Sequence, residues 1–501
     1  MDLNKKLSVA AFAVFISSCA VAALEFGTPF SDGAVLQRDR KVPVWGIASP
    51  GAEVTVAFAG NSFKTAADEK GGWRVDLPPM PASKESRVLS AVSGGEKAEA
   101  RDILVGEVWF ASGQSNMECP IWGTRPRYRD GKGSLVTQMT RLPCVRFAKN
   151  QRAWNAKPSR RLKAVWCKMT PENFTAEKTM KSGNPSTLSA VAYYFARELY
   201  LALDVPVGIV DSSWGGTNID AWTPRAGYEG CDPSIAATAT RPVKEKPEPE
   251  ELKAPVSKPW QQPTVLWNGM VESWAPMAMR GFIWYQGCHN SDHPESSLYC
   301  AKMHALYNGW SRRFENPGLK LYFCQLAPYR KPWMQIIAQQ TKFINEEKNA
   351  GMAVLADAGN FFDIHPNDKE TVAKRLAALA LKRDYGFSSI DPEPPVVKNV
   401  TAKGHRIFIE FDKDVYIYNN DFSGKALFEV AGADGKWAPA TVEGFKSQAH
   451  LGKRICLSSK HVKSPAKVRY LYIPPFTGSV FGENSIPLAA FEANVKKGKK
   501  Q

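Results

Sequence analysis

Ser115 is the residue of this 501-residue chain whose setting first indicates chemistry. It stands in residues 105–117, VGEVWFASGQSNM, where an apolar run ends in small and polar residues. Such a run predicts a buried strand that ends in a tight turn. Gly113 would let the backbone bend sharply there, and many serine hydrolases hold their nucleophile on a strand-to-helix turn. A lone turn serine would be an ordinary loop residue, so its companions decide.

Three later stretches supply those companions. They are residues 213–218 (SWGGTN), 284–290 (WYQGCHN) and 363–366 (DIHP). A serine hydroxyl is a weak nucleophile until a base such as His365 takes its proton. The oxyanion of an acyl-transfer intermediate also needs preorganised hydrogen-bond donors. The candidates for these donors are the backbone N–H groups of Ser115, Gly215 and Gly216 and the side-chain amide of Asn290.

An alternation of apolar strands and helical patterns in residues 105–390 would position these side chains. Strands are predicted at 105–111, 207–211, 281–285, 319–325 and 352–357. Helices are predicted at 188–203, 298–314, 333–347 and 371–384, the last with Asp368 as its N-cap. This rhythm predicts a doubly wound parallel sheet. Because ligands bind outside the carboxyl ends of the strands in such sheets, one crevice would collect all four stretches.

Two regions of strand-like alternation flank this frame. Residues 25–104 alternate apolar and polar positions between turns, which predicts a small β-sandwich. The same rhythm returns in residues 392–492, which we interpret as a second β domain. Residues 242–263 are rich in Pro, Lys and Glu and predict an exposed loop, and residues 493–501 form a basic tail. We therefore expect three domains, at 25–104, 105–391 and 392–492, as the chain length also suggests.

The charge balance limits the classes of partner. The chain has 65 Lys and Arg against 49 Asp and Glu, a formal net charge of +16. This excess gives a weak preference for anions. The sequence shows neither a basic helix nor a known nucleic-acid module, so we expect no nucleic-acid partner. No segment is long enough to predict a membrane span.

Residues 1–24 predict an export signal, because two lysines precede a short apolar run and then small residues. Residues 16–19 also resemble a loose bacterial lipobox, which would leave Cys19 lipidated at a new N-terminus. Residues 20–22 offer simple cleavage instead, which we favour. We expect an exported protein, whether periplasmic, secreted or a surface lipoprotein. The other eight cysteines do not have the spacing of a disulfide scaffold, although one or two bridges would fit export.

The four stretches resemble the motifs of the SGNH (GDSL-like) hydrolases, specifically of the sialate O-acetylesterase family. That family has a GQSNM nucleophile block, a WGGT block, a WYQGE-x-N block and an IHP-type histidine block. The resemblance includes residues 35–38 (VLQR) and 43–46 (PVWG) and reaches residues 468–470 (VRY). It implies an α/β fold, in which an SGNH (flavodoxin-like) doubly wound parallel-sheet hydrolase domain is flanked by N- and C-terminal β-sandwich-like domains.

The resemblance also implies an activity, the removal of O-acetyl groups from a small sugar or glycan without a cofactor. Sialate 9-O-acetylesterase is the first choice. Ser115 would be the nucleophile, and His365 would act as base and then as acid. Gly215, Gly216 and Asn290 would form the oxyanion hole, and the substrate contacts would come from Gln114, Trp214, Gln286 and His289. Two alternatives stay open: an esterase for acetyl xylan or another polysaccharide, and a catalytically impaired carbohydrate-binding relative.

Two positions depart from the family pattern. Cys288 stands where the family has a glutamate, and a thiol with an ordinary pKa of roughly 8.5 is a poor substitute for a carboxylate. The superfamily acid usually stands three residues before the histidine, where this chain has Phe362. Asp363 is one residue closer, and Asp357 ends the preceding predicted strand. We favour Asp363 as the orienting acid, while Asp357 and a Ser–His dyad without a carboxylate stay open.

A metal interpretation is also raised by the run that contains Cys288, His289, Asp292 and His293. Thiols and imidazoles bind zinc, but this run lacks the paired spacing of known zinc sites. We therefore predict no metal site here.

Overall fold

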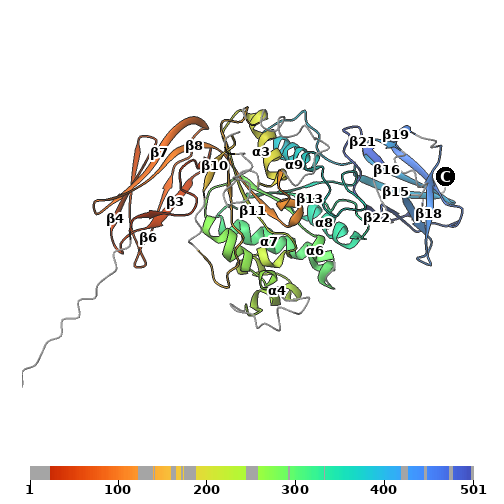
Figure 1. Cartoon of the computed structure of the whole chain (residues 1–501). Coiled ribbons are helices and arrows are strands. Elements are labelled where there is room, and N and C mark those ends of the chain that lie inside the picture. Colours follow the sequence, from red (N-terminus) through yellow and green to blue (C-terminus); the bar gives the residue numbers. More distant parts are fainter. Residues whose placement is uncertain are drawn as a thin grey trace, which may run out of the picture.

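The computed structural model of the chain describes residues 23–121, 139, 141–159, 165–170, 173, 188–243, 258–291, 294–331, 333–418, 427–444, 448–472 and 478–497. Several predictions fall outside the described residues, namely the leader 1–22 with Cys19, residues 244–257 of the exposed loop, Asp292 and His293, and the tail 498–501. Figure 1 shows three regions in a row: N-terminal strands, a central body of strands and helices, and C-terminal strands.

The N-terminal region consists of short strands joined by turns. Its strands are β1 (Glu25–Phe26), β2 (Val35–Gln37), β3 (Val42–Ile47), β4 (Glu53–Phe58), β5 (Asn61–Ala66), β6 (Gly72–Leu77), β7 (Ser83–Ser93) and β8 (Glu96–Gly113). One antiparallel sheet has the order β1-β3-β6, and in a second group β4 pairs with β5 and β7, and β7 with β8. Side chains along β4 and β6 alternate in burial, as a strand with one solvated face requires.

Strand β8 connects this region to the centre of the molecule. Its first residues alternate in burial against β7, whereas residues 103–113 are all buried. Over this second part β8 pairs in parallel with β11 (Val207–Ser213) on one side and β12 (Gly281–Tyr285) on the other. The strand thus passes without a break through the domain boundary predicted at 104/105.

The central sheet has the order β10-β9-β11-β8-β12-β13-β14, and within it only the edge strand β10 runs antiparallel. The remaining strands are β9 (Val145–Lys149), β10 (Trp166–Lys168), β13 (Lys320–Cys324) and β14 (Ala350–Ala353). The chain places β9, β10 and β11 on one side of β8, with β11 inserted next to it, and then adds β12, β13 and β14 outward on the other side. The carboxyl end of β8 therefore lies where the direction of winding reverses, the usual position of a ligand site in such sheets.

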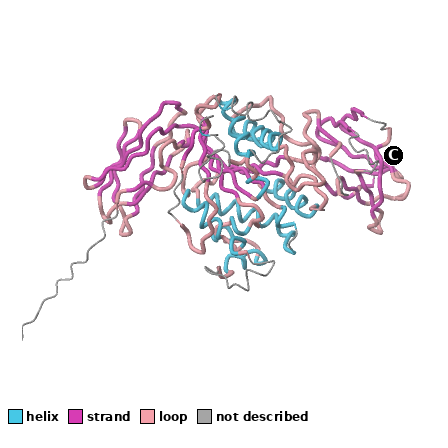
Figure 2. The backbone as a smooth tube through the Cα atoms, in the orientation of Figure 1, coloured by secondary structure: helices cyan, strands magenta, loops and turns pink. Residues whose placement is uncertain are grey.

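Helices cover both faces of this sheet. They are α1 (Ser115–Glu118), α3 (Ala190–Leu203), α4 (Pro233–Thr240), α6 (Cys288–Ser291), α7 (Tyr299–Arg313), α8 (Met334–Glu346) and α9 (Lys369–Asp384). Helices α3 and α9 pack together on one face, and α7 and α8 on the other (Figures 1 and 2). The mixed α/β architecture predicted from the sequence is confirmed. Asp368 caps α9 by accepting a hydrogen bond from the Thr371 N–H, as predicted.

The C-terminal region is a mostly antiparallel sheet. Its strands are β15 (Val397–Lys403), β16 (Arg406–Tyr418), β17 (Phe428–Ala431), β18 (Trp437–Val442), β19 (Gln448–Ser458), β20 (Lys467–Tyr470), β21 (Val480–Gly482), β22 (Phe491–Asn494) and β23 (Lys496–Lys497). It contributes none of the side chains of the candidate site.

Two further observations concern membrane-spanning helices and disulfides. Within the described ranges, no helix combines the length and the apolar character that crossing a bilayer demands. None of the eight cysteines in the described part of the chain is in a disulfide.

Candidate active site

Ser115 is the first residue of α1, directly beyond the carboxyl end of β8. Gly113 makes this turn with φ +139°, and a Cβ there would lie 2.4 Å from the carbonyl oxygen of Tyr285. Only glycine fits such a backbone, because an L side chain would be strained and would clash. The turn places the half-buried serine at the edge of the sheet, between the ends of β11 and β12.

His365 reaches Ser115 from the loop before α9. Its Nε2 lies 2.8 Å from the serine Oγ, which is hydrogen-bonding distance. Burial lowers the pKa of the imidazole, and the charge of Lys369 lowers it further, while Asp363 opposes both effects. A histidine whose pKa lies below its ordinary value is neutral at pH 7 and can accept the serine proton.

The two candidate acids differ in their surroundings. Asp363 Oδ1 accepts the backbone N–H of His365 at 2.9 Å and lies 4.0 Å from the imidazole Nδ1. Asp357 is instead held by Arg375, which donates to its two oxygens at 2.6 and 2.7 Å. Of the two, only Asp363 faces the histidine, although its distance from Nδ1 exceeds that of a hydrogen bond.

The loop after β11 approaches the serine closely. A Cβ on Gly215 would lie 3.2 Å from the Cβ of Ser115, so the absence of a side chain permits this approach. The Gly215 N–H, predicted as an oxyanion donor, already donates to Glu118 Oε2 at 2.8 Å and is therefore not available in this structure. Gly216 has φ +70°, and its carbonyl accepts from Gln261.

Gln114 and Gln286, predicted as substrate contacts, are buried and hold the loops around the site together. Gln286 is fully buried and donates to the Thr217 carbonyl and to Asn290 Oδ1. Gln114 is buried too, and its Oε1 accepts the backbone N–H groups of Gly287 and His289. Their predicted role in substrate contact stays a prediction.

Asn290 keeps one end of its amide available. Its Oδ1 accepts from the Ile219 N–H and from Gln286, so the Nδ2 group is the end left to donate. No described residue accepts a hydrogen bond from this Nδ2. Asn290 also lines a hollow of about 150 Å³. Its assignment to the oxyanion hole stays a prediction.

Trp214 stacks on Trp260, with the ring centroids 5.5 Å apart and the planes 14° from parallel. Both rings are half-buried, and each carries a nearby cation: Arg152 over Trp214 and Lys258 over Trp260. His289 is half-buried in α6, beyond β12. Trp214 and His289 thus keep the partial exposure that a substrate contact needs.

No role was predicted for Asn116 and Lys369 from the sequence. The Asn116 amide donates to the Ile364 carbonyl at 3.0 Å and accepts from Lys369 Nζ at 2.6 Å. It therefore ties the histidine loop to the residue next to the nucleophile. Its place in the GQSNM stretch was the available signal. For Lys369 there was no comparable indication in the sequence, because a lysine just before a predicted helix is expected to be exposed to solvent.

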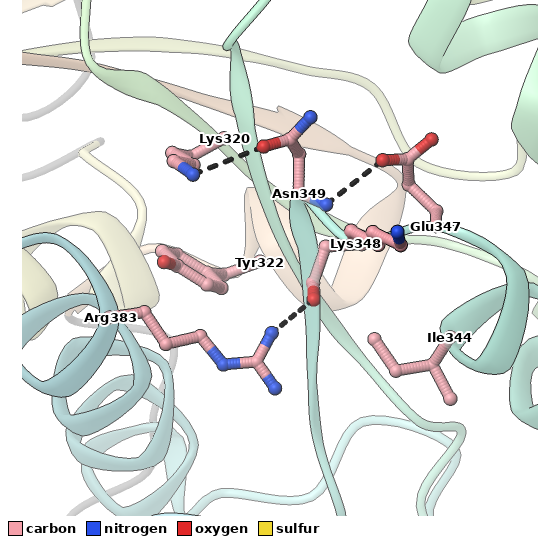
Figure 3. Close-up of a pocket in the computed structure, with 8 residues that line it drawn as sticks. Lys320, Tyr322, Ile344, Glu347, Lys348, Asn349 and Arg383 are labelled. Carbon is pink, nitrogen blue, oxygen red and sulfur yellow. Dashed lines mark hydrogen bonds between the residues drawn. The ribbon is translucent and has the colours of Figure 1, made fainter.

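Other polar groups lie apart from this site. A hollow of about 450 Å³ lies at the amino ends of β13 and β14, opposite the catalytic edge, and Figure 3 shows residues that line it. Two of its cations have partners, since Lys320 donates to Asn349 and Arg383 to the Ala350 carbonyl. In the described part of the chain, the side chains that could hold a metal ion are Cys300, His304 and Glu346 on α7 and α8. Cys300 and His304 each form a hydrogen bond to Glu346.

Comparison with known proteins identifies relatives along most of the chain. The model of the family "Carbohydrate esterase, sialic acid-specific acetylesterase" matches residues 254–377. The sialate O-acetylesterase of Mus musculus is 26% identical over 484 residues, which cover 86% of this chain and 87% of that protein. The human enzyme, from Homo sapiens, is 27% identical over 465 residues, covering 85% and 83%.

A solved structure extends the likeness to the fold. The crystal structure of a carbohydrate acetylesterase from Xanthomonas citri is 30% identical and superimposes with a TM-score of 0.78. The match covers 94% of this chain and 99% of that one. The shared fold, the Ser115–His365 pair and these relatives agree: the chain belongs to the sialate O-acetylesterase family of carbohydrate esterases.

Proposed function

We propose that the protein is a serine esterase that hydrolyses O-acetyl esters on a carbohydrate, with 9-O-acetylated sialic acid as its substrate. The observation that carries this proposal is the 2.8 Å hydrogen bond between Ser115 Oγ and His365 Nε2 at the carboxyl edge of the parallel sheet. The SGNH arrangement, with β-sandwich-like domains on both flanks of the hydrolase domain, is part of the proposal.

The reaction would proceed in two acyl-transfer steps. His365 Nε2 takes the Ser115 proton while Oγ forms a bond to the acetyl carbonyl carbon, and the carbonyl oxygen becomes an oxyanion. Collapse of this intermediate breaks the bond to the sugar oxygen, which receives the proton from His365. Water then attacks the acetyl-serine with His365 again as base, and acetate leaves. No step requires a cofactor.

The oxyanion needs donors that are in place before the reaction. With the Gly215 N–H donating to Glu118, we assign this role to the N–H groups of Ser115 and Gly216 and to Asn290 Nδ2. Asp363 would stabilise the imidazolium by its charge from 4.0 Å.

The preference for an acidic sugar has support beside the serine. The half-buried, stacked Trp214 and Trp260 offer aromatic surface on which the apolar face of a sugar ring could pack. Arg152, whose side chain is 55% exposed, and Lys258 place positive charge at the same position. Part of the Arg152 charge is neutralised by Glu118, yet its guanidinium has five donors and can also bind a substrate carboxylate.

Release of acetate tests the proposal directly. Purified protein is assayed first with p-nitrophenyl acetate and then with 9-O-acetylated sialic acid and acetylated xylan at equal ester concentration, with Ser115→Ala as the background. We expect turnover of the first, and a higher kcat/KM on the sialic acid ester than on the xylan. The reverse preference would assign the protein to the polysaccharide esterases.

Absence of acetate release above the Ser115→Ala background on all three esters would reject the esterase proposal and favour a carbohydrate-binding relative. The proposal of export, with or without a lipid on Cys19, is tested separately by the mass and N-terminal sequence of the mature protein from its native host. An unprocessed N-terminus would contradict it.

A further inference from the structure

Lys369 is a buried cation directly behind the catalytic pair. The residue is 1% exposed and stands at the start of α9, four residues after His365. Within the described ranges its ammonium has one hydrogen-bond acceptor, Asn116 Oδ1 at 2.6 Å, and no ion-pair partner. Buried lysines are rare unless paired with an acid, so this one calls for an explanation.

The groups that face Lys369 do not neutralise it. From every element around it these are Cys119 after α1, Tyr285 at the end of β12, Cys288 at the start of α6, Cys324 at the end of β13, and Asp363 in the histidine loop. Burial raises the pKa of the Cys119 and Cys324 thiols, so they stay neutral at pH 7. The only carboxylate in the set, that of Asp363, is half exposed to solvent.

Position 288 explains why the charge is uncompensated. Cys288 is buried close to Lys369, and the neighbouring Tyr285 hydroxyl is also buried, without a hydrogen-bond partner in the described structure. An ammonium and an orphaned hydroxyl beside one position are the donors that a carboxylate would accept from. This chain has a thiol there.

Lys369 is connected to the catalytic base in two ways. Through Asn116 it is linked to the carbonyl of Ile364, the residue that precedes His365. Through space, its positive charge disfavours a second positive charge on the imidazole.

We propose that Lys369 is a positioning residue of the esterase site: its uncompensated ammonium anchors the His365 loop through Asn116 and keeps the imidazole neutral, ready to accept the serine proton. The role rests on the proposed esterase activity. Because Cys288 leaves the ammonium uncompensated, the protein works at lower pH than it would with a glutamate at position 288.

The test compares Lys369→Met, Cys288→Glu and the control Lys374→Met. Lys374 lies on the same helix but is 54% exposed and pairs with Glu370. Two quantities are measured for each protein: the pH dependence of kcat/KM on p-nitrophenyl acetate, and the titration of the His365 ring by NMR, assigned with His365→Gln. The NMR titration needs no turnover, so it remains informative even if the wild type hydrolyses no ester.

Both Lys369→Met and Cys288→Glu are expected to move the acid limb and the His365 titration to higher pH, and Lys374→Met is expected to move neither. Lys369→Met should also lose roughly ten- to a hundredfold in kcat/KM at pH 7, because the loop anchor is gone. Cys288→Glu keeps that anchor and should retain most of the wild-type activity at pH 7, losing only the fraction of imidazole that becomes protonated. An unchanged titration in both variants overturns the proposal. If Lys369→Met does not fold, Cys288→Glu decides alone.

Discussion

The two ends of the central sheet treat buried charge in opposite ways. At the amino edge, Glu107 of β8 lies opposite the first residue of β11 and is fully buried. Its oxygens accept hydrogen bonds from four side chains, those of Gln37, Arg38, Arg280 and Tyr385. Burial alone would raise the pKa of Glu107, but these partners outweigh it and leave the pKa below its ordinary value.

At the carboxyl edge, beyond Gly113 at the end of the same strand, the polar groups are not matched in this way. Lys369 has an amide oxygen as its acceptor and no ion pair, and the Tyr285 hydroxyl has no partner in the described residues. The comparison teaches where the molecule is built for stability and where it gives up stability for reactivity. Unmatched buried polar groups are rare and concentrate where chemistry is done.

Replacing Ser115 with alanine should cause the largest loss of activity. It should show that a residue at the carboxyl edge can be removed without loss of stability. Loss of an activated serine costs on the order of 10⁶ in kcat in a comparable hydrolase. The thermal midpoint should stay within a degree or two of the wild type, because no buried group loses a structural partner. Acetate release and differential scanning calorimetry measure the two quantities. A variant that retains a substantial share of turnover would show that another residue is the nucleophile.

His365→Ala should lose activity nearly as fully, since the serine then has no base. Asp363→Asn should lose less, because the carboxylate lies 4.0 Å from the imidazole and acts by charge. Asp357→Asn is the matched control, in which the lost partner is Arg375. The measurement is kcat/KM at pH 7. If Asp357→Asn proved the more damaging of the two, the orienting role would belong to Asp357.

Glu107→Gln should lower the free energy of unfolding by about 3–5 kcal/mol, because it leaves the guanidinium groups of Arg38 and Arg280 without their carboxylate. Activity of the folded fraction should stay near that of the wild type. Urea unfolding checks the first expectation and kcat/KM at low temperature the second. Glu315→Gln, which removes an exposed partner of Arg74, is the control and should cost about 0–1 kcal/mol. Equal losses in the two variants would contradict the comparison.

The pH dependence of the free energy of unfolding should reveal how much the buried, protonated Lys369 destabilises the folded protein. Burial lowers the pKa of Lys369 from 10.5 to about 8. Between these values the unfolded chain holds a proton that the folded protein has released, so the free energy of unfolding rises with pH in this window. The difference of pKa corresponds to about 3 kcal/mol between pH 8 and 10.5. Lys369→Met should lack this rise, and parallel curves for the two proteins would mean that the ammonium is not destabilised by burial.

The fold was predictable where the pattern was local. The strand at Gly281–Tyr285 and the four long helices follow from apolar periodicity, and their observed limits lie within two residues of the predicted ones. Strand β9 was not predicted, because it carries Arg146 and Lys149 into a buried strand. Their charges are compensated by Asp102 and Asp211, partners far away in the sequence.

The motifs predicted which residues gather at the site, but not which of them are buried. Ser115 and His365 meet as the motifs predict. Gln114 and Gln286 belong to the same motifs but brace the loops from inside, and a motif does not reveal burial. Lys369 was missed because its role depends on its surroundings in space, which include three thiols and an amide. The residues next to it in the sequence do not indicate these surroundings.

The unbroken course of β8 has a mechanical consequence. One strand of 18 residues runs from the N-terminal sheet to Gly113, so the first region and the turn that presents the nucleophile share a single strand, which is irregular where its register with β7 shifts. A cut at residue 104 would divide a strand that both sheets share, not a linker. The N-terminal strands are therefore not an appendage that could be removed or exchanged. Their pairing with β8 helps to hold the strand whose carboxyl end positions Ser115.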